Sequence, residues 1–132
     1  MAGLNLLADA CALIVFHGFG GQTMSSAGKA AMRQGEVFVC PITVWEITRK
    51  IALGKLERPA PPGFKGTLSE WLRQVGYRVL PMTRDACEQA NSLPAHHKVP
   101  MDRMLIALAL DRGMTVITDD ELFAQYRVST IW

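Results

Sequence analysis

The sequence has few cysteines and no paired cysteine motif. Three cysteines occur in 132 residues, and Cys11, Cys40 and Cys87 are far apart in the chain. An odd number of isolated cysteines argues against a disulfide framework and against a thiolate zinc site. We therefore expect a protein of a reducing compartment, with its cysteines packed as small apolar side chains.

Long hydrophobic runs are also missing. No segment approaches the roughly 20 uninterrupted apolar residues that a membrane-spanning helix requires. The apolar start of the chain carries no basic n-region and is interrupted at Asp9, which is not the pattern of a signal peptide. These features predict a cytoplasmic protein that does not enter a membrane.

Charge of one sign does not dominate the chain. The 14 Lys and Arg residues stand against 12 Asp and Glu residues, which gives a formal net charge of +2. Because the whole chain exerts little attraction on nucleic acid, any RNA binding must depend on a local basic patch. Lys50, Lys55 and Arg58 offer such a patch, and a solvated helix end is the alternative interpretation.

The sequence does contain a regular alternation of strand and helix patterns. Strands are expected at residues 4–8, 37–40, 78–82, 114–118 and 128–131. Helices are expected at residues 25–34, 43–53, 67–76, 84–93 and 102–112, with loops at 58–66 and 94–100. This alternation predicts an α/β fold, a three-layer sandwich in which helices flank a mainly parallel central sheet. A single domain, residues 1–132, suits the length.

Acidic residues stand where several of these elements begin or end. Asp9 comes directly after the first expected strand, and Asp119 and Asp120 follow the fourth. Glu46 lies in the first turn of the helix after the second strand, and Asp102 opens the last expected helix. Functional groups of such folds gather at the carboxyl ends of the strands. We therefore expect these acids to be candidates for one site.

Clustered carboxylates are what a divalent-metal phosphodiesterase requires. Like charges brought close raise the pKa of their neighbours unless a cation neutralises them. Mg²⁺ prefers oxygen ligands and is usually held by a few carboxylates together with the substrate phosphate. Such a site needs no covalent nucleophile, and the chain has neither a G-x-S-x-G elbow nor a P-loop.

Each acid also has a simpler explanation. Asp is a favoured helix N-cap, and acids in a first helical turn complement the helix dipole. Thr43 and Glu46 have the spacing of a capping box, and Glu46 can also pair with Arg49 or Lys50 along its helix. Spacing alone leaves both the caps and the metal cluster open.

Four segments together resemble the motifs of a known family. They are LLAD at 6–9, PITVWEI at 41–47 with LGKL at 53–56, LPAHH at 93–97 leading to MDRMLIA at 101–107, and VITDD at 116–120 followed by Phe123, Tyr126 and Trp132. In their order and in the length of the chain they resemble PIN-domain ribonuclease toxins of the VapC type. Such proteins are the toxin component of type II toxin–antitoxin pairs.

The resemblance implies a metal-dependent endoribonuclease that hydrolyses RNA phosphodiester bonds through a carboxylate-bound Mg²⁺ or Mn²⁺. Asp9, Glu46, Asp102 and Asp120 match the four acids that act in catalysis and hold the metal. Asp119 occupies the variable position before the fourth acid, where it can substitute or assist.

Supporting residues follow from the same resemblance. Thr118 is a candidate to hydrogen-bond a ligating carboxylate. Arg103 is a candidate to meet a phosphate or a site acid, with a plain position on the helix face as the alternative. The family often has Thr or Ser after the first Asp, where this chain has Ala10, and this departure puts one supporting hydrogen bond in doubt.

The resemblance also implies partners. The substrate is expected to be a structured RNA such as tRNA or rRNA, and the inhibitor a cognate antitoxin protein whose C-terminal segment crosses the active-site groove. A homodimer is the usual assembly. Two other functions remain open, an inactive PIN-like module that binds RNA or protein and another Mg²⁺-dependent phosphohydrolase that acts on DNA.

The pair His96–His97 offers imidazole ligands for zinc. Adjacent residues do not share a face, and no third His or Cys lies at ligand spacing. A zinc site is therefore not expected, and a loop near the path of the RNA is one alternative for this pair.

Overall fold

The computed structural model describes residues 5–19, 22–58, 60–61 and 63–132. The first residue of the expected strand 4–8 and two positions of the expected loop 58–66 lie outside the described residues.

Five parallel strands form one sheet in the order β3-β2-β1-β4-β5. The strands are β1 (Asn5–Ala8), β2 (Glu36–Val39), β3 (Arg78–Val79), β4 (Thr115–Ile117) and β5 (Thr130–Ile131). The central strand β1 pairs with β2 and β4, so that Leu7 stands between Phe38 and Val116. The expected α/β fold with a mainly parallel sheet is confirmed.

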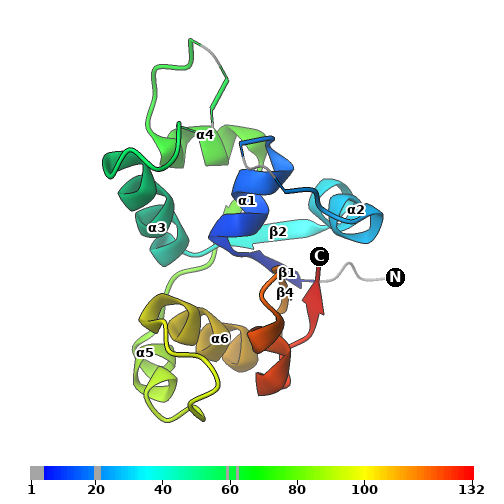
Figure 1. The fold of residues 1–132 in the computed structure, drawn as a ribbon, viewed down its shortest axis with the longest axis vertical. Helices are drawn as coiled ribbons and strands as arrows, with labels where there is room; N and C mark the ends of the chain where they lie inside the picture. Colours follow the sequence, from blue (N-terminus) through cyan, green and yellow to red (C-terminus); the bar gives the residue numbers. More distant parts are fainter. Residues whose placement is uncertain (1–4, 20–21, 59, 62) are drawn as a thin grey trace.

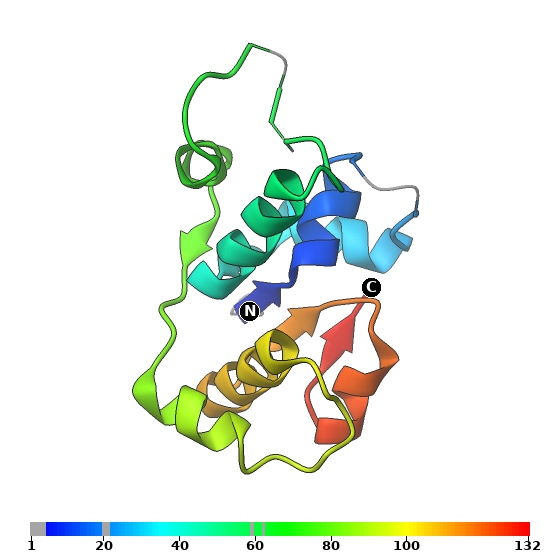
Figure 2. The same ribbon diagram turned by 60° about the vertical axis from the view of Figure 1, so that its left-hand side comes forward.

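Helices cover both faces of this sheet. They are α1 (Ala10–Phe16), α2 (Ser26–Gln34), α3 (Pro41–Ala52), α4 (Leu68–Val75), α5 (Arg84–Ala90), α6 (Pro100–Arg112) and the 3-10 helix η1 (Glu121–Tyr126). Figure 1 shows α1 to α4 on one side of the strands and α5, α6 and η1 on the other. The turned view in Figure 2 shows the same separation. The three-layer arrangement expected from the sequence is therefore confirmed.

The core has one part on each face of the sheet. Leu6 and Ala8 of β1 belong to the cluster under α1 to α4, whereas Leu7 belongs to the cluster with α6 and η1. Successive side chains of a strand point to opposite faces, so a strand covered on both sides must be apolar throughout. This explains why LLA in β1 is an uninterrupted apolar run that ends at Asp9.

Proline at the first position sets the start of α3 and of α6. Pro41 and Pro100 begin these helices, because a proline ring suits the first turn, where the missing N–H has no helical partner. Helix α3 thus starts two residues before Thr43, and Glu46 lies in its second turn rather than its first. The capping box expected for Thr43 and Glu46 is wrong, since Cys40 is the N-cap and makes no side-chain cap.

Other boundaries differ from the expectation in length. β3 has two residues where residues 78–82 were expected, and α5 ends at Ala90 rather than at residue 93. Residues 10–16 and 121–126 form α1 and η1, which were not among the expected helices. Cys87 is exposed, so the expected packing as a small apolar side chain does not hold for it. None of the helices in the described ranges is long and apolar enough to cross a membrane.

Helix α6 offers a test of the core. Ile106 is fully buried and Leu110, one turn later on the same helix, is 41% exposed. We expect Ile106→Ala to lower the free energy of unfolding by about 2–5 kcal/mol, because it removes buried methylenes and leaves a cavity. Leu110→Ala is the matched control, with an expected change within about 0.5 kcal/mol. Urea titrations followed by circular dichroism measure both, and equal losses would contradict the packing described here.

Candidate metal centre

A cavity of about 140 Å³ opens where β1 and β4 end. It is lined by Asp9, Ala10, Cys11, Glu46, Lys50, Asp102, Asp119 and Asp120. The five acids singled out in the sequence therefore meet at one cavity, although they come from four separate segments of the chain. The carboxyl ends of β1 and β4, together with α3 and α6, bring them there.

Asp9 is the most deeply buried of these acids. Its carboxylate is 8% exposed and accepts a hydrogen bond of 2.8 Å from the Ala12 N–H, so it caps α1. Burial raises the pKa of Asp9 to about 7, although hydrogen bonds from the Thr118 side chain and the Ala12 backbone oppose this rise. The neighbouring charges of Asp102 and Asp119 raise that pKa further. In the metal-free fold this carboxylate is thus difficult to ionise.

Asp102 lies in the first turn of α6 and faces the same cavity. Burial, followed by the charge of Glu46, raises its pKa to about 6. Two acids of one cavity therefore have elevated pKa values for the same physical reasons, loss of water and the proximity of like charges.

The chain leaving β4 supplies two further acids and a hydroxyl. Thr118 is buried, and its Oγ1 accepts from the Asp120 N–H at 3.1 Å. Its side chain is also near enough to Asp9 to lower the pKa of that acid. Asp120 caps η1 with Oδ1, which accepts from the Leu122 N–H at 3.0 Å.

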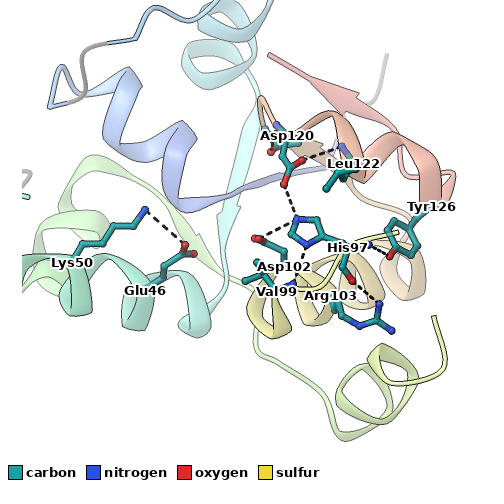
Figure 3. A network of polar contacts seen from close by, with 10 residues as sticks. Glu46, Lys50, His97, Val99, Asp102, Arg103, Asp120, Leu122 and Tyr126 are labelled. Atoms are coloured by element: carbon teal, nitrogen blue, oxygen red, sulfur yellow. Dashed lines mark hydrogen bonds and ion pairs between the residues drawn. The ribbon is translucent and has the colours of Figure 1, made fainter. Parts of the chain in front are cut away.

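His97 is a site residue that the sequence did not identify. Its ring is 5% exposed, and Nε2 lies 2.7 Å from Asp120 Oδ2 and 3.3 Å from Asp102 Oδ2 (Figure 3). These three side chains place possible ligand atoms within 4.8 Å of one another. Spacing could not show this because His96 and His97 differ in orientation, and only the loop conformation decides which ring turns inward. His96 is exposed and packs against the Tyr126 ring.

Arg103 has a structural contact set. Its guanidinium donates to four backbone carbonyls, those of Ala90, Leu93, Pro94 and His97, at distances between 2.8 and 3.1 Å. The ion pairs found among the described residues do not include Arg103. Arg103 is therefore neither paired with a site acid nor simply exposed on the helix face, two of the expected alternatives. Its hydrogen bonds instead connect the loop before α6 to that helix.

Cations lie beside the acids. Lys50 Nζ is 3.8 Å from Glu46 Oε1, one turn apart on α3, so the pairing considered from the sequence is present. Lys50 and Cys11 also line a second, adjoining cavity of about 450 Å³. Its other lining residues are Ile14, Val15, Phe19, Gln22, Lys55 and Leu56. Arg58 donates to Phe64 O and Gly66 O within its own loop.

The donor set fits a hard divalent cation. The acids of the cavity offer carboxylate oxygens, the ligands that Mg²⁺ and Mn²⁺ accept. Burial without a cation raises the pKa of Asp9 and of Asp102, and a bound cation would remove this penalty by favouring the charged forms. Asp9, Glu46, Asp102 and Asp120 are the candidates to hold it, with Asp119 beside them.

The pKa values predict how the stability of the metal-free protein changes with pH. The pKa of Asp9 is about 7 in the fold against an ordinary value of 3.8, so the folded chain binds this proton more tightly than the unfolded chain. The resulting stabilisation is complete below about pH 4 and is lost as the pH rises through about 7. In EDTA we expect Asp9→Asn, which keeps the Oδ1 acceptor for the cap, to gain melting temperature relative to wild type between about pH 5 and pH 8.

Asp111→Asn, an exposed acid near the end of α6, is the control and should track wild type at every pH. Melting curves followed by circular dichroism across this range, with and without Mg²⁺, provide the measurement. At about pH 8, Mg²⁺ should stabilise wild type and leave Asp9→Asn almost unchanged. A difference between wild type and Asp9→Asn that is constant with pH would show that Asp9 ionises normally.

Comparisons with known proteins identify the family and the fold. The family model of the PIN domain matches residues 6–128. FitAcB from Neisseria gonorrhoeae is similar in structure, with 21% identity, a TM-score of 0.64, and coverage of 96% of each chain. FitAB bound to an IR36 DNA fragment has 19% identity and a TM-score of 0.63, covering 96% of this chain and 93% of that one. A toxin–antitoxin complex from Klebsiella pneumoniae has 17% identity and a TM-score of 0.58, with 90% of each chain covered.

No curated protein matches the chain. At these identities the structural likeness establishes the fold, and the family model establishes the family. Because that model covers nearly the whole sequence, from β1 to the residues before β5, the chain belongs to the PIN domain family.

Proposed function

We propose that the protein is a divalent-metal-dependent endoribonuclease and the toxin component of a toxin–antitoxin pair. One observation carries the proposal: five acids from four segments line a single cavity in a chain of the PIN domain family. PIN domains are generally nucleases, and a nuclease needs such oxygen ligands for its metal. Residues 1–132 constitute one nuclease domain in this proposal.

Asp9, Glu46, Asp102 and Asp120 are the proposed metal-binding and catalytic residues, with Asp119 assisting at the rim. When bound, Mg²⁺ or Mn²⁺ supplies positive charge for the phosphate and lowers the pKa of water. The carboxylates would hold the cation, and one of them would accept the proton that water releases as its oxygen attacks phosphorus. The P–O bond on the opposite side would break, and its oxygen would leave with a proton from solvent. Thr118, whose side chain lowers the pKa of Asp9, is the proposed supporting residue for this carboxylate.

RNA is the proposed substrate, with tRNA and rRNA as the candidate classes. Lys50 and Lys55 line the cavity that adjoins the acids, and their charges suit the phosphates that flank the cleaved bond. Phe19 and Leu56 give the same cavity an apolar side, against which a base can pack. In this arrangement the RNA strand would run from the acids past Lys50 to Lys55.

The proposed partner is a cognate antitoxin protein. Two of the structural neighbours are described as a toxin–antitoxin complex and as FitAB bound to DNA, which supports a partner that inhibits the toxin. We further propose a homodimer, supported by exposed apolar side chains such as Trp45 and Val79, which are 51% and 67% exposed. A cytoplasmic location follows from this function, since its RNA substrates occur there.

The first experiment is RNA cleavage by the purified protein. With Mg²⁺ or Mn²⁺ we expect cutting of tRNA or rRNA, and with EDTA no cutting. Asp9→Asn should lower the rate by at least about 100-fold, more than the loss of an outer contact to a metal ligand. Gel analysis of labelled RNA gives the rates, and Asp111→Asn is the control that should retain them.

Two outcomes would redirect the proposal. Metal-dependent cleavage of DNA with intact RNA would favour a deoxyribonuclease. Binding of RNA without cutting, in either metal and over varied structured RNAs, would favour a non-catalytic PIN module. Residual activity of Asp9→Asn close to wild type would remove this cavity from the mechanism.

A second prediction concerns Lys50. If its Nζ meets an RNA phosphate, Lys50→Gln weakens RNA binding and reduces the slope of log K against log salt by about one. Binding is measured in EDTA, where the RNA stays intact, by fluorescence anisotropy at several salt concentrations. Lys29→Gln, an exposed lysine on α2 away from the acids, is the matched control. An unchanged slope for Lys50→Gln would exclude the phosphate contact.

A further inference from the structure

We propose that His97 is a positioning residue: its Nε2–H donates to Asp120 and also faces Asp102, so that it holds both carboxylates for the cation without ligating the cation itself. The inference rests on the proposed metal site and adds a residue to it. Three observations support it: the contacts of the two ring nitrogens, the contacts that fix the loop, and the hydrogen bonds that both Asp120 oxygens accept.

The ring nitrogens have distinct partners. The Val99 N–H donates to His97 Nδ1 at 3.2 Å, which requires a lone pair on Nδ1. The proton of the ring must then be on Nε2, since a neutral imidazole has one donor and one acceptor nitrogen. Nε2–H points to Asp120 Oδ2 at 2.7 Å, and Nε2 lies 3.3 Å from Asp102 Oδ2 (Figure 3).

This tautomer argues against His97 as a metal ligand, which is the most direct alternative role for its ring. Because the ligand atoms of His97, Asp102 and Asp120 lie close together, His97 could also serve as a nitrogen ligand of a transition metal. A ligating Nε2 must present its lone pair to the metal, and the proton would then have to be on Nδ1. The Val99 N–H faces Nδ1 and opposes that tautomer.

The loop that carries His97 is fixed on several sides. The His97 N–H donates to Tyr126 Oη at 2.6 Å, and this hydroxyl donates to Pro94 O at 2.6 Å. Arg103 donates to the carbonyls of Pro94 and His97. The His97 ring also packs edge-on against Phe123, with centroids 5.9 Å apart. A buried ring with so many neighbours has little freedom to turn away from the acids.

Asp120 is consequently held at both oxygens. Oδ1 caps η1 through Leu122 N–H, and Oδ2 accepts from His97. A carboxylate of fixed orientation loses little side-chain entropy when it takes up a cation, and outer contacts of this kind typically change metal affinity by about 10–100-fold. Nε2 also lies close to both Asp102 and Asp120, so one ring contacts both carboxylates.

The test measures metal binding rather than cleavage. We expect His97→Leu to weaken Mn²⁺ binding by about 10–100-fold, as measured by titration calorimetry and electron paramagnetic resonance. His97→Gln, which keeps an amide N–H donor of similar reach, should recover part of the loss. His96→Leu, the exposed neighbour in the same loop, is the control and should bind Mn²⁺ as wild type does.

A double-mutant cycle separates positioning from a general effect on folding. If His97 acts through Asp120, His97→Leu has a much smaller effect on Mn²⁺ affinity when Asp120→Asn is already present. Equal effects in both backgrounds would overturn the inference. So would an Mn²⁺ affinity of His97→Leu equal to that of wild type, or the absence of Mn²⁺ binding by wild type.

Nitrogen NMR of ¹⁵N-histidine-labelled wild type reports the tautomer without any substitution. We expect a protonated Nε2 and an unprotonated Nδ1, both in EDTA and with Mg²⁺ or Zn²⁺ bound. Loss of the Nε2 proton on addition of either metal would make His97 a ligand and overturn the assignment. These readouts do not use RNA, so a protein that binds metal through this set but cuts no RNA would lose the proposed function and keep this inference.

Discussion

Burial of a carboxylate at the end of the central strand is the constraint on which the site depends. β1 is covered by helices on both faces, so its residues must be apolar until the chain leaves the sheet, and Asp9 is the first position where it does. There the carboxylate has little water, and other acids lie near it, which is why its pKa rises. The fold therefore brings acids together with an unfavourable charge distribution, which a bound cation would relieve.

Helix capping and metal binding are compatible uses of the same side chains. Asp9 and Asp120 each cap a following helix through Oδ1, and the second oxygen of Asp120 is turned to His97. The cap fixes the direction of the carboxylate, because the first amide groups of the helix are themselves fixed. Of the two interpretations that spacing alone left open, the caps are present at Asp9 and Asp120, and they are compatible with the proposed metal site.

Asp9, Asp119 and Asp120 could be predicted as neighbours from the sequence because they follow the ends of adjacent strands, whereas Glu46 and Asp102 lie in the first two turns of helices. Pro41 and Pro100 mark the starts of α3 and α6, and the proline at the start of α3 explains why Glu46 lies in the second turn rather than the expected first. His97 and Arg103 were harder to predict. The orientation of the first depends on the loop conformation, and the partners of the second are backbone carbonyls, which leave no pattern in the sequence.

The loop before α6 has a consequence for recognition. Both terminal nitrogens of Arg103 donate hydrogen bonds to carbonyls at the end of α5 and in this loop. The Tyr126 hydroxyl makes two further hydrogen bonds to the backbone of the same loop. A segment that orders only on binding loses roughly 1–2 kcal/mol of conformational free energy per residue. Here that loss has already occurred during folding, so a molecule that meets exposed His96 on this loop meets a rigid surface. Selectivity at this edge of the cavity then comes from the shape of the ligand rather than from adjustment of the protein.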